Sequence, residues 1–296
     1  MVHSAIAGSR GRAARLHRIG AACGVVAAAA FLGAAPASGA AALGGTAAGR
    51  AAAPRFHPII SVHAPGNSVK AAQSNNWSGY NEGYLDTHTT FSSVSGEWTV
   101  PTATQHTPGQ AESSATWVGI GGGCLSTSCT ATDSTLIQAG TEQDVSASGA
   151  ASYSAWWELV PVPSVTASIA VHPGDLITCS ISSTLPGVWS IVLKDLTDGQ
   201  GFTETVPYPS TEDTAEWIEE SPLVIGTSGA GIAALPDLGK VSFSDATVNG
   251  HSAGLVPGEA IQLVSSSGAV LATPSAPAST DNAFNDCTYA TTCPAP

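Results

Sequence analysis

Five short strings in this chain supply residue types that a hydrolytic site uses. In chain order they are NNWSGY at 75–80, TWVGI at 116–120, QAG at 138–140, WWE at 156–158 and AEWIE at 215–219. Four of them set tryptophan among polar or acidic residues, and the third contributes Gln138. A glutamate beside apolar rings loses hydration, which favours its protonated form and suits it to proton transfer. A nearby amide can polarise a carbonyl without adding charge, so the set indicates an active site.

The order and spacing of these strings resemble those of the glutamic peptidases, the eqolisin or G1 family of pepstatin-insensitive acid proteases. The resemblance runs from about Asn75 to the C-terminus and includes Pro207-Tyr208 and the string LGKVSF at 238–243. Each string is weak alone, but all of them in this order are specific. The resemblance therefore implies an acid endopeptidase that acts on polypeptide substrates.

The resemblance also implies a catalytic dyad of Gln138 and Glu216. Glu216 as a carboxylate would take a proton from the attacking water and return it to the departing nitrogen. Gln138 would hold the water and donate a hydrogen bond to the developing oxyanion. Trp117 is expected to line the cleft and Glu158 to lie near the dyad, both as substrate-binding residues. Because an unperturbed glutamate titrates near pH ~4.3, activity should be highest in acid.

One position departs from the family. After TWVGI many members carry an aspartate, whereas this chain has Gly121, which begins a run of three glycines followed by Cys124. We expect this departure to affect substrate binding at that point and to leave the reaction unchanged.

Other functions fit parts of the same pattern. Tryptophans more often pack a sheet than contact substrate, and Glu216 alone would be one of 22 acidic residues. A β-sandwich glycoside hydrolase could use Glu158 and Glu216, and a non-catalytic carbohydrate-binding module is a further alternative. The glycosidase needs its two carboxyls roughly 5–10 Å apart across an open groove, whereas Gln138 facing Glu216 favours the peptidase.

Sequence motifs of two other peptidase classes and of zinc sites are missing. The chain has no HExxH and no paired DTG or DSG strings, which disfavours metallo- and pepsin-like peptidases. No CxxC pair accompanies the cysteines, so zinc is not indicated. We expect neither a metal nor another cofactor.

Acidic and basic residues are separated along the chain. All 22 acidic residues lie beyond residue 70, whereas seven of the nine lysines and arginines lie at or before it. Beyond residue 70 only Lys194 and Lys240 oppose the carboxylates, a net charge of −20 with histidine neutral. Such a body repels nucleic acid and anionic membrane. It also keeps few unopposed cations in acid, which favours acid tolerance.

Residues 1–40 have the pattern of a secretory signal peptide. Arg10–Arg18 form a basic region, Ile19–Leu32 form an apolar stretch short of a comfortable membrane span, and small residues at 35–40 suit cleavage. We therefore expect a secreted, extracellular protein with no membrane attachment after signal removal.

Residues 41–70 contain Arg50, Arg55 and Lys70 and no acid, and their composition predicts a flexible linker. The resemblance adds a second interpretation, a basic propeptide that lies on the acidic enzyme. In that case charging of His57 and His63 near pH ~6.5 should first strengthen the contact. Release should then follow as the carboxylates titrate near pH ~4.

Residues 71–296 are one domain's worth of chain, and alternation of apolar and polar residues dominates them. The clearest runs are 164–171, 189–194 and 241–244, and turn signals lie at 173–175, 186–187, 198–199 and 249–250. No segment has the pattern of a three-turn helix. These features predict an all-β fold of two packed antiparallel sheets, a β-sandwich. The resemblance implies a monomeric, concanavalin A-like pair of curved sheets with a concave substrate cleft.

Five cysteines follow the signal region, and an oxidising compartment favours their pairing. Cys179 alternates with Ile177 and Ile181, which predicts a buried thiol within a strand. The spacing of the remaining four predicts two local disulfides, Cys124–Cys129 and Cys287–Cys293.

Overall fold

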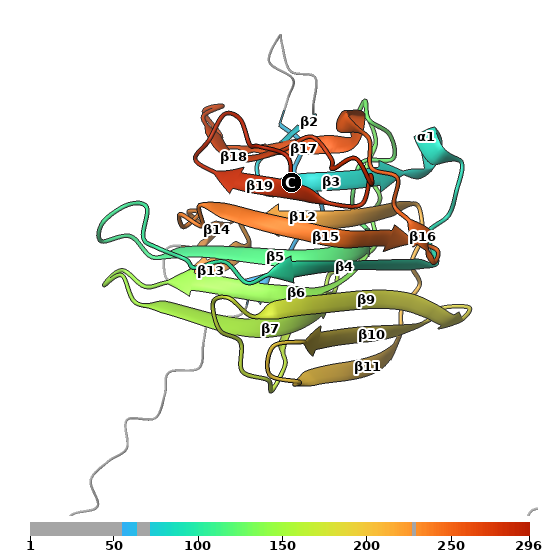
Figure 1. Cartoon of the computed structure of the whole chain (residues 1–296), viewed down its shortest axis with the longest axis horizontal. Coiled ribbons are helices and arrows are strands. Elements are labelled where there is room, and N and C mark those ends of the chain that lie inside the picture. Colours follow the sequence, from blue (N-terminus) through green and yellow to red (C-terminus); the bar gives the residue numbers. More distant parts are fainter. Residues whose placement is uncertain (1–54, 64–71, 227–228) are drawn as a thin grey trace, which may run out of the picture. The chain divides into compact units, whose positions relative to one another are not determined.

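The computed structural model of the chain describes residues 55–63, 72–226 and 229–296 (Figure 1). The expected signal peptide, residues 1–40, lies outside these ranges, and so does segment 41–70 apart from residues 55–63. Within the described ranges, no helix is both long and apolar enough to cross a bilayer.

The first layer of the fold is an antiparallel sheet in the order β11-β10-β9-β4-β15-β19. Its strands are β4 (Ser93–Thr99), β9 (Leu176–Leu185), β10 (Val188–Asp195), β11 (Gly201–Pro207), β15 (Lys240–Val248) and β19 (Phe284–Thr288). A short strand, β16 (His251–Ser252), pairs with β15.

The second layer is an antiparallel sheet in the order β8-β7-β6-β5-β12-β3-β17. Its strands are β3 (Trp77–Gly83), β5 (Glu112–Gly121), β6 (Leu136–Val145), β7 (Ala151–Leu159), β8 (Val165–Thr166), β12 (Thr214–Glu220) and β17 (Ala260–Val264). β18 (Val270–Pro274) pairs with both β17 and β19 and so joins the two layers along one edge. β2 (Ala72–Ser74) runs parallel to β17.

The remaining described elements are short. The two helical turns are α1 (Tyr84–Thr87) and the 3-10 turn η1 (Pro257–Glu259). A separate three-stranded sheet consists of β1 (Arg55–Phe56), β13 (Leu223–Gly226) and β14 (Gly229–Ile232). The observed architecture therefore confirms the predicted all-β sandwich.

The hydrophobic core lies between the two layers, which Figure 1 shows one in front of the other. Val118 and Ala139 of the second layer share a buried cluster with Ile191 and Phe243 of the first. Two indole groups donate across the layers, from Trp98 to Thr141 Oγ1 at 3.0 Å and from Trp217 to the Ser95 carbonyl at 2.8 Å. Since successive residues of a strand point to opposite faces, every second residue of these strands points away from this core.

The predicted alternation is confirmed in β10 and β15, where every second residue is buried over most of the strand. The expected strand at 164–171 is largely wrong. Only Val165–Thr166 form a strand, β8, although Ala167 and Ile169 still pack against the core from irregular backbone. Alternating burial can thus arise without ladder hydrogen bonds, because it records contact with the core rather than strand pairing.

The cysteines fall into the two local pairs that their spacing predicted. Cys124 is bonded to Cys129 and Cys287 to Cys293. Cys179 is a buried free thiol in β9, with its Sγ 3.6 Å from the Ala139 carbonyl oxygen.

Candidate active site

Five residues form a row across five neighbouring strands of the second layer. Direct cross-strand pairs join Asn81 to Glu216, Glu216 to Gly119, Gly119 to Gln138, and Gln138 to Glu158. Directly opposed residues of antiparallel strands project from the same face of a sheet. The register of β3, β12, β5, β6 and β7 therefore brings strings from distant parts of the chain together on one face.

Gly119 lies between the two expected catalytic residues. The Cα atoms of Gln138 and Glu216 are two strand spacings apart, roughly 10 Å, and Gly119 itself contributes no side chain between them. A Cβ at Gly119 would lie 2.7 Å from Cζ3 of Trp117 and 3.1 Å from Cδ1 of Leu136. Packing therefore requires glycine here, because the Trp117 ring and Leu136 lie directly over this position.

The row lies on the face of the second layer that points away from the sandwich core. A separate apolar cluster on this face includes Trp77, Trp117, Trp156 and Ile218. The Trp77 and Trp117 rings meet edge to face, with centroids 4.9 Å apart and an interplanar angle of 76°. The tryptophans of the strings are thus divided between two faces, since Trp217 belongs to the core between the layers.

Residues 55–63, which we call the strap, cover this face. Nε2 of Gln138 donates to the His57 carbonyl oxygen at 2.6 Å, and the His57 amide donates to Oε2 of Glu158 at 2.8 Å. Further along the strap, the Ile60 amide donates to the Gly122 carbonyl oxygen at 3.0 Å. The strap thus crosses the sheet from β7 past β6 towards the loop after β5.

Arg55 attaches the start of the strap to carboxylates of β6. Its Nε lies 3.2 Å from Oε1 of Glu142, and one terminal nitrogen lies 2.5 Å from Oδ2 of Asp144. The other terminal nitrogen donates to Oγ of Ser113 at 2.9 Å. Arg55 of the basic segment is thus paired with two acidic residues of the body.

The glycine run after β5 folds closely over Glu216. A Cβ at Gly123 would lie 2.1 Å from Oδ1 of Asn81 and 2.6 Å from Oε1 of Glu216, so only glycine fits. Asn81 fixes this loop through both backbone groups of Cys124, accepting from its amide and donating to its carbonyl oxygen at 3.0 Å. Gly121 has a φ of 94°, which favours glycine as well.

Burial controls the protonation of both acids in the row. Burial raises the pKa of Glu216 well above its usual range, and nearby Asp133 and Glu82 add to the effect. Neither carboxyl oxygen of Glu216 has a hydrogen-bond partner among the described residues. Burial also raises the pKa of Glu158 to about 8, against the opposing hydrogen bond from the His57 amide. Burial therefore favours the neutral form of Glu216.

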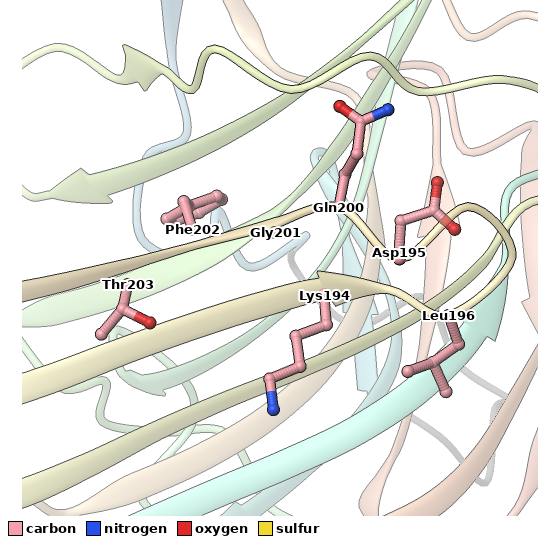
Figure 2. A pocket seen from close by; sticks show the side chains of 8 residues that line it. Lys194, Asp195, Leu196, Gln200, Gly201, Phe202 and Thr203 are labelled. Carbon is pink, nitrogen blue, oxygen red and sulfur yellow. The ribbon is translucent and has the colours of Figure 1, made fainter.

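A hollow of about 380 Å³ lies elsewhere, at the turn between β10 and β11 of the first layer (Figure 2). Its lining includes Lys194, Asp195, Gln200 and Phe202. Asp195 accepts from the backbone amide of Thr197 at 2.8 Å, as turn residues commonly do. This hollow contains no residue of the five strings, and we do not regard it as the active site.

Glu158 lies next to Gln138 in the row, and Trp117 lies on the same face. Trp117 is fully buried, and its Nε1 donates to Oε2 of Glu220 at 2.9 Å. Sequence reasoning missed Glu220 and Asn81. Both could have been found from the period of two along a strand. Glu220 follows Glu216 by four residues and Asn81 follows Trp77 by four, so each pair shares a face.

The Peptidase A4 family model matches residues 75–285. The chain belongs to this family of glutamic peptidases, and the protein is therefore a peptide-bond hydrolase.

The chain is similar to one curated peptidase and to several solved structures. Aspergillopepsin-2 of Aspergillus niger is 28% identical over 215 residues, which are 63% of this chain and 68% of that protein. A crystal structure of scytalido-glutamic peptidase with a peptide-based transition state analogue is 21% identical, with a TM-score of 0.54, over 72% of this chain and 98% of that one. This similarity supports the sandwich fold. Aspergilloglutamic peptidase from Aspergillus niger is 25% identical over 60% of this chain and 99% of that one, with a TM-score of 0.47.

The glycosidase alternative receives no support from the site. Gln138 stands between Glu158 and Glu216 in the row, and its amide is hydrogen-bonded to Glu158 at 3.1 Å. Two acids that flank a glycosidic bond need an open gap between them, and that gap is occupied here by Gln138.

Proposed function

We propose that this peptidase is a secreted, pepstatin-insensitive acid endopeptidase whose catalytic dyad is Gln138 and Glu216. The observation that supports the dyad is the row in which only Gly119 separates the two residues. Gly119 has no side chain, so its own residue places nothing between the amide and the carboxyl.

The proposed reaction is general base catalysis followed by general acid catalysis. Glu216 as a carboxylate takes a proton from water, and the resulting hydroxide attacks the carbonyl carbon of the scissile peptide. Nε2 of Gln138 donates a hydrogen bond to the oxyanion of the tetrahedral intermediate. Glu216 then gives its proton to the departing nitrogen, so that the carbon–nitrogen bond breaks and the carboxylate is restored.

Glu158 and Trp117 serve this reaction as substrate-binding and positioning residues. Glu158 accepts from Nε2 of Gln138 and from a backbone amide of the bound segment. Trp117 orients the buried carboxyl of Glu220, which faces the same cleft.

We also propose that residues 41–70 are a cleaved propeptide and that the strap within them inhibits the enzyme. The strap occupies the amide of Gln138, the proposed oxyanion donor, and so blocks the dyad. Its removal would free this donor for a substrate carbonyl. The strap therefore supports the propeptide interpretation over that of a linker.

The test is digestion of denatured casein or haemoglobin at acid pH by the processed protein, with and without pepstatin. We expect activity in both conditions, and we expect Glu216→Gln to lose it. Glu204→Gln, the same chemical change on β11 of the first layer, serves as the matched control and should remain active. Near-normal turnover by processed Glu216→Gln would exclude this dyad, and N-terminal sequencing of the secreted protein would identify both cleavage positions.

A further inference from the structure

The backbone of His57 is hydrogen-bonded to two residues of the row. Its carbonyl oxygen accepts from Nε2 of Gln138, and its amide donates to Glu158. The preceding residues Arg55–Phe56 form β1, which pairs with β13 by backbone ladder. One side of a bound chain is thus held as a strand up to the residue whose carbonyl meets Gln138.

The His57 side chain fills a pocket of defined chemistry. Its ring stacks on Trp156 with centroids 3.6 Å apart and an interplanar angle of 9°. Nδ1 lies 3.1 Å from Oε2 of Glu220, and Nε2 lies 3.8 Å from Oε1 of Glu142. His57 is 0% exposed, so the pocket encloses the ring completely.

The acidic groups of this pocket are held in place by the fold. Glu220 is 0% exposed, and Oε2 of its carboxyl also accepts from Nε1 of Trp117 at 2.9 Å. The second oxygen of Glu220 has no hydrogen-bond partner among the described residues. A carboxyl that is buried, oriented and only partly satisfied gains by meeting a donor or a cation.

Only the strap brings cations to this face within the described part of the chain. Arg55 pairs with Glu142 and Asp144, whereas Lys194 and Lys240 lie on β10 and β15 of the first layer. Departure of the strap therefore leaves a cleft lined by carboxyl groups on β6, β7 and β12. A hollow of about 330 Å³ beside Arg55, lined by Ser113, Val224 and Ile232 among others, extends the groove on the amino-terminal side of His57.

We infer that the pocket of Trp156, Glu220 and Glu142 is a substrate subsite that selects histidine or arginine as the residue that contributes the attacked carbonyl. This inference rests on the proposed function, because it takes Gln138 as the donor to that carbonyl. It names a substrate preference that the catalytic dyad alone does not determine.

The selectivity follows from two demands that few side chains meet together. A planar group with N–H donors in its plane can stack on an indole and also donate a hydrogen bond to Glu220. Phenylalanine can stack but leaves the carboxyl without a donor, and glutamine can donate but stacks poorly. An unpaired buried carboxyl disfavours the wrong side chain by roughly tenfold or more.

The experiment compares peptide substrates that differ only in the residue before the scissile bond, histidine, arginine, phenylalanine or glutamine. With the processed enzyme at acid pH, we expect kcat/KM for histidine and arginine to exceed that for phenylalanine and glutamine by about tenfold. Glu220→Gln should reduce this ratio to near one, and Glu142→Gln should reduce it less. Glu204→Gln should keep the wild-type ratio.

Cleavage-site mapping of the wild-type enzyme on denatured proteins gives a second measurement that needs no variant. Enrichment of histidine and arginine before the cut would support the subsite, and its absence would overturn it. An unchanged ratio in folded Glu220→Gln would overturn it too. If Glu216→Gln stays active, the proposed dyad itself fails, whereas an active wild type with no preference and an inactive Glu216→Gln refutes the subsite alone.

Discussion

Nε2 of Gln138 lies 3.1 Å from Oε2 of Glu158, its directly opposed neighbour on β7. In its ionised form Glu158 accepts only from the nitrogen end of an amide, and it then determines which way the Gln138 amide faces. The same nitrogen donates to the His57 carbonyl oxygen. A substrate carbonyl in this position would therefore meet an N–H group rather than a repelling oxygen.

The first prediction concerns this orientation. Glu158→Gln removes the fixed acceptor, because a glutamine can donate or accept and lets the Gln138 amide turn over. We expect kcat to fall by about tenfold, less than the ~10²–10³ that loss of the donor itself costs. Steady-state kinetics on a peptide substrate would measure this, and an unchanged kcat would show that Glu158 does not orient the amide.

The second prediction concerns Gln138 directly. Gln138→Ala should lower kcat by about 10²–10³, the usual effect of removing an oxyanion donor. Gln138→Glu sets a second acid opposite the site of Glu216, which should raise the pKa of one of the pair. The acid limb of the pH–rate profile should then move to higher pH. A profile that keeps its wild-type position would contradict the proximity of the two groups.

The third prediction concerns the loop over the catalytic acid. Gly123→Ala would force Cβ against Asn81 and Glu216, so the loop must shift. We expect at least a tenfold loss of activity and about 1–3 kcal/mol of destabilisation from overpacking. Gly258→Ala is the matched control, because its Cβ would meet only Thr127 at an ordinary 3.6 Å. Equal activity in the two variants would argue against close packing on Glu216.

The fourth prediction concerns release of the strap. The structure corrects the expectation that charging His57 strengthens the contact, since burial and Arg55 lower the pKa of His57 well below 6.5. Protonation therefore opposes docking. The acids that face His57 behave in the opposite way, because burial raises the pKa of Glu142 to about 7, that of Glu158 to about 8, and that of Glu220 as well.

The sign of each effect defines the pH window. Docking takes up protons on these acids as pH falls towards ~4.3, below which they are neutral whether the strap is bound or free. Below that pH only the protonation of His57 still differs between the bound and the free strap. This protonation favours the free strap by about tenfold per pH unit. We expect activation of the precursor to accelerate below about pH 4. His57→Phe keeps the stacked ring but not the proton, so its activation should lose this steep dependence, and identical pH profiles would refute the mechanism.

The fifth prediction concerns two acids between the layers. Burial raises the pKa of Glu219 well above its usual range, with Asp286 adding to the effect, and burial raises the pKa of Asp286 to about 7. A raised folded-state pKa gives stability below the unfolded pKa that is lost as pH rises through the folded one. The processed protein should therefore be less stable at pH 8 than at pH 4.

Glu219→Gln tests this assignment by denaturant titration. The substitution keeps an acceptor for Thr116 Oγ1, which lies 2.6 Å from Oε2 of Glu219, and removes the charge. We expect it to stabilise the fold by about 1–3 kcal/mol at pH 8 and to have little effect at pH 4. Glu204→Gln should have little effect at either pH. An equal effect of Glu219→Gln at both pH values would contradict the role of its ionisation.

The sequence by itself determined the sandwich class and the family. Alternating residues in β10 and β15 predicted half-buried strands, and the five strings identified the glutamic peptidases. Both signals are local, because the period of two and the composition of a string are written in consecutive residues. For the same reason the spacing of the cysteines was sufficient to predict two short disulfide loops.

Only the tertiary structure decided which residues meet. The row from Asn81 to Glu158 depends on the register of five strands, and a shift of one residue would turn each side chain to the other face. The enclosure of His57 by Trp156 and Glu220 depends on contacts between segments about 100 and 160 residues apart, as long-range packing does. Such contacts leave no local pattern, because their free energy arises from burial and hydrogen bonding that exist only once the chain has folded.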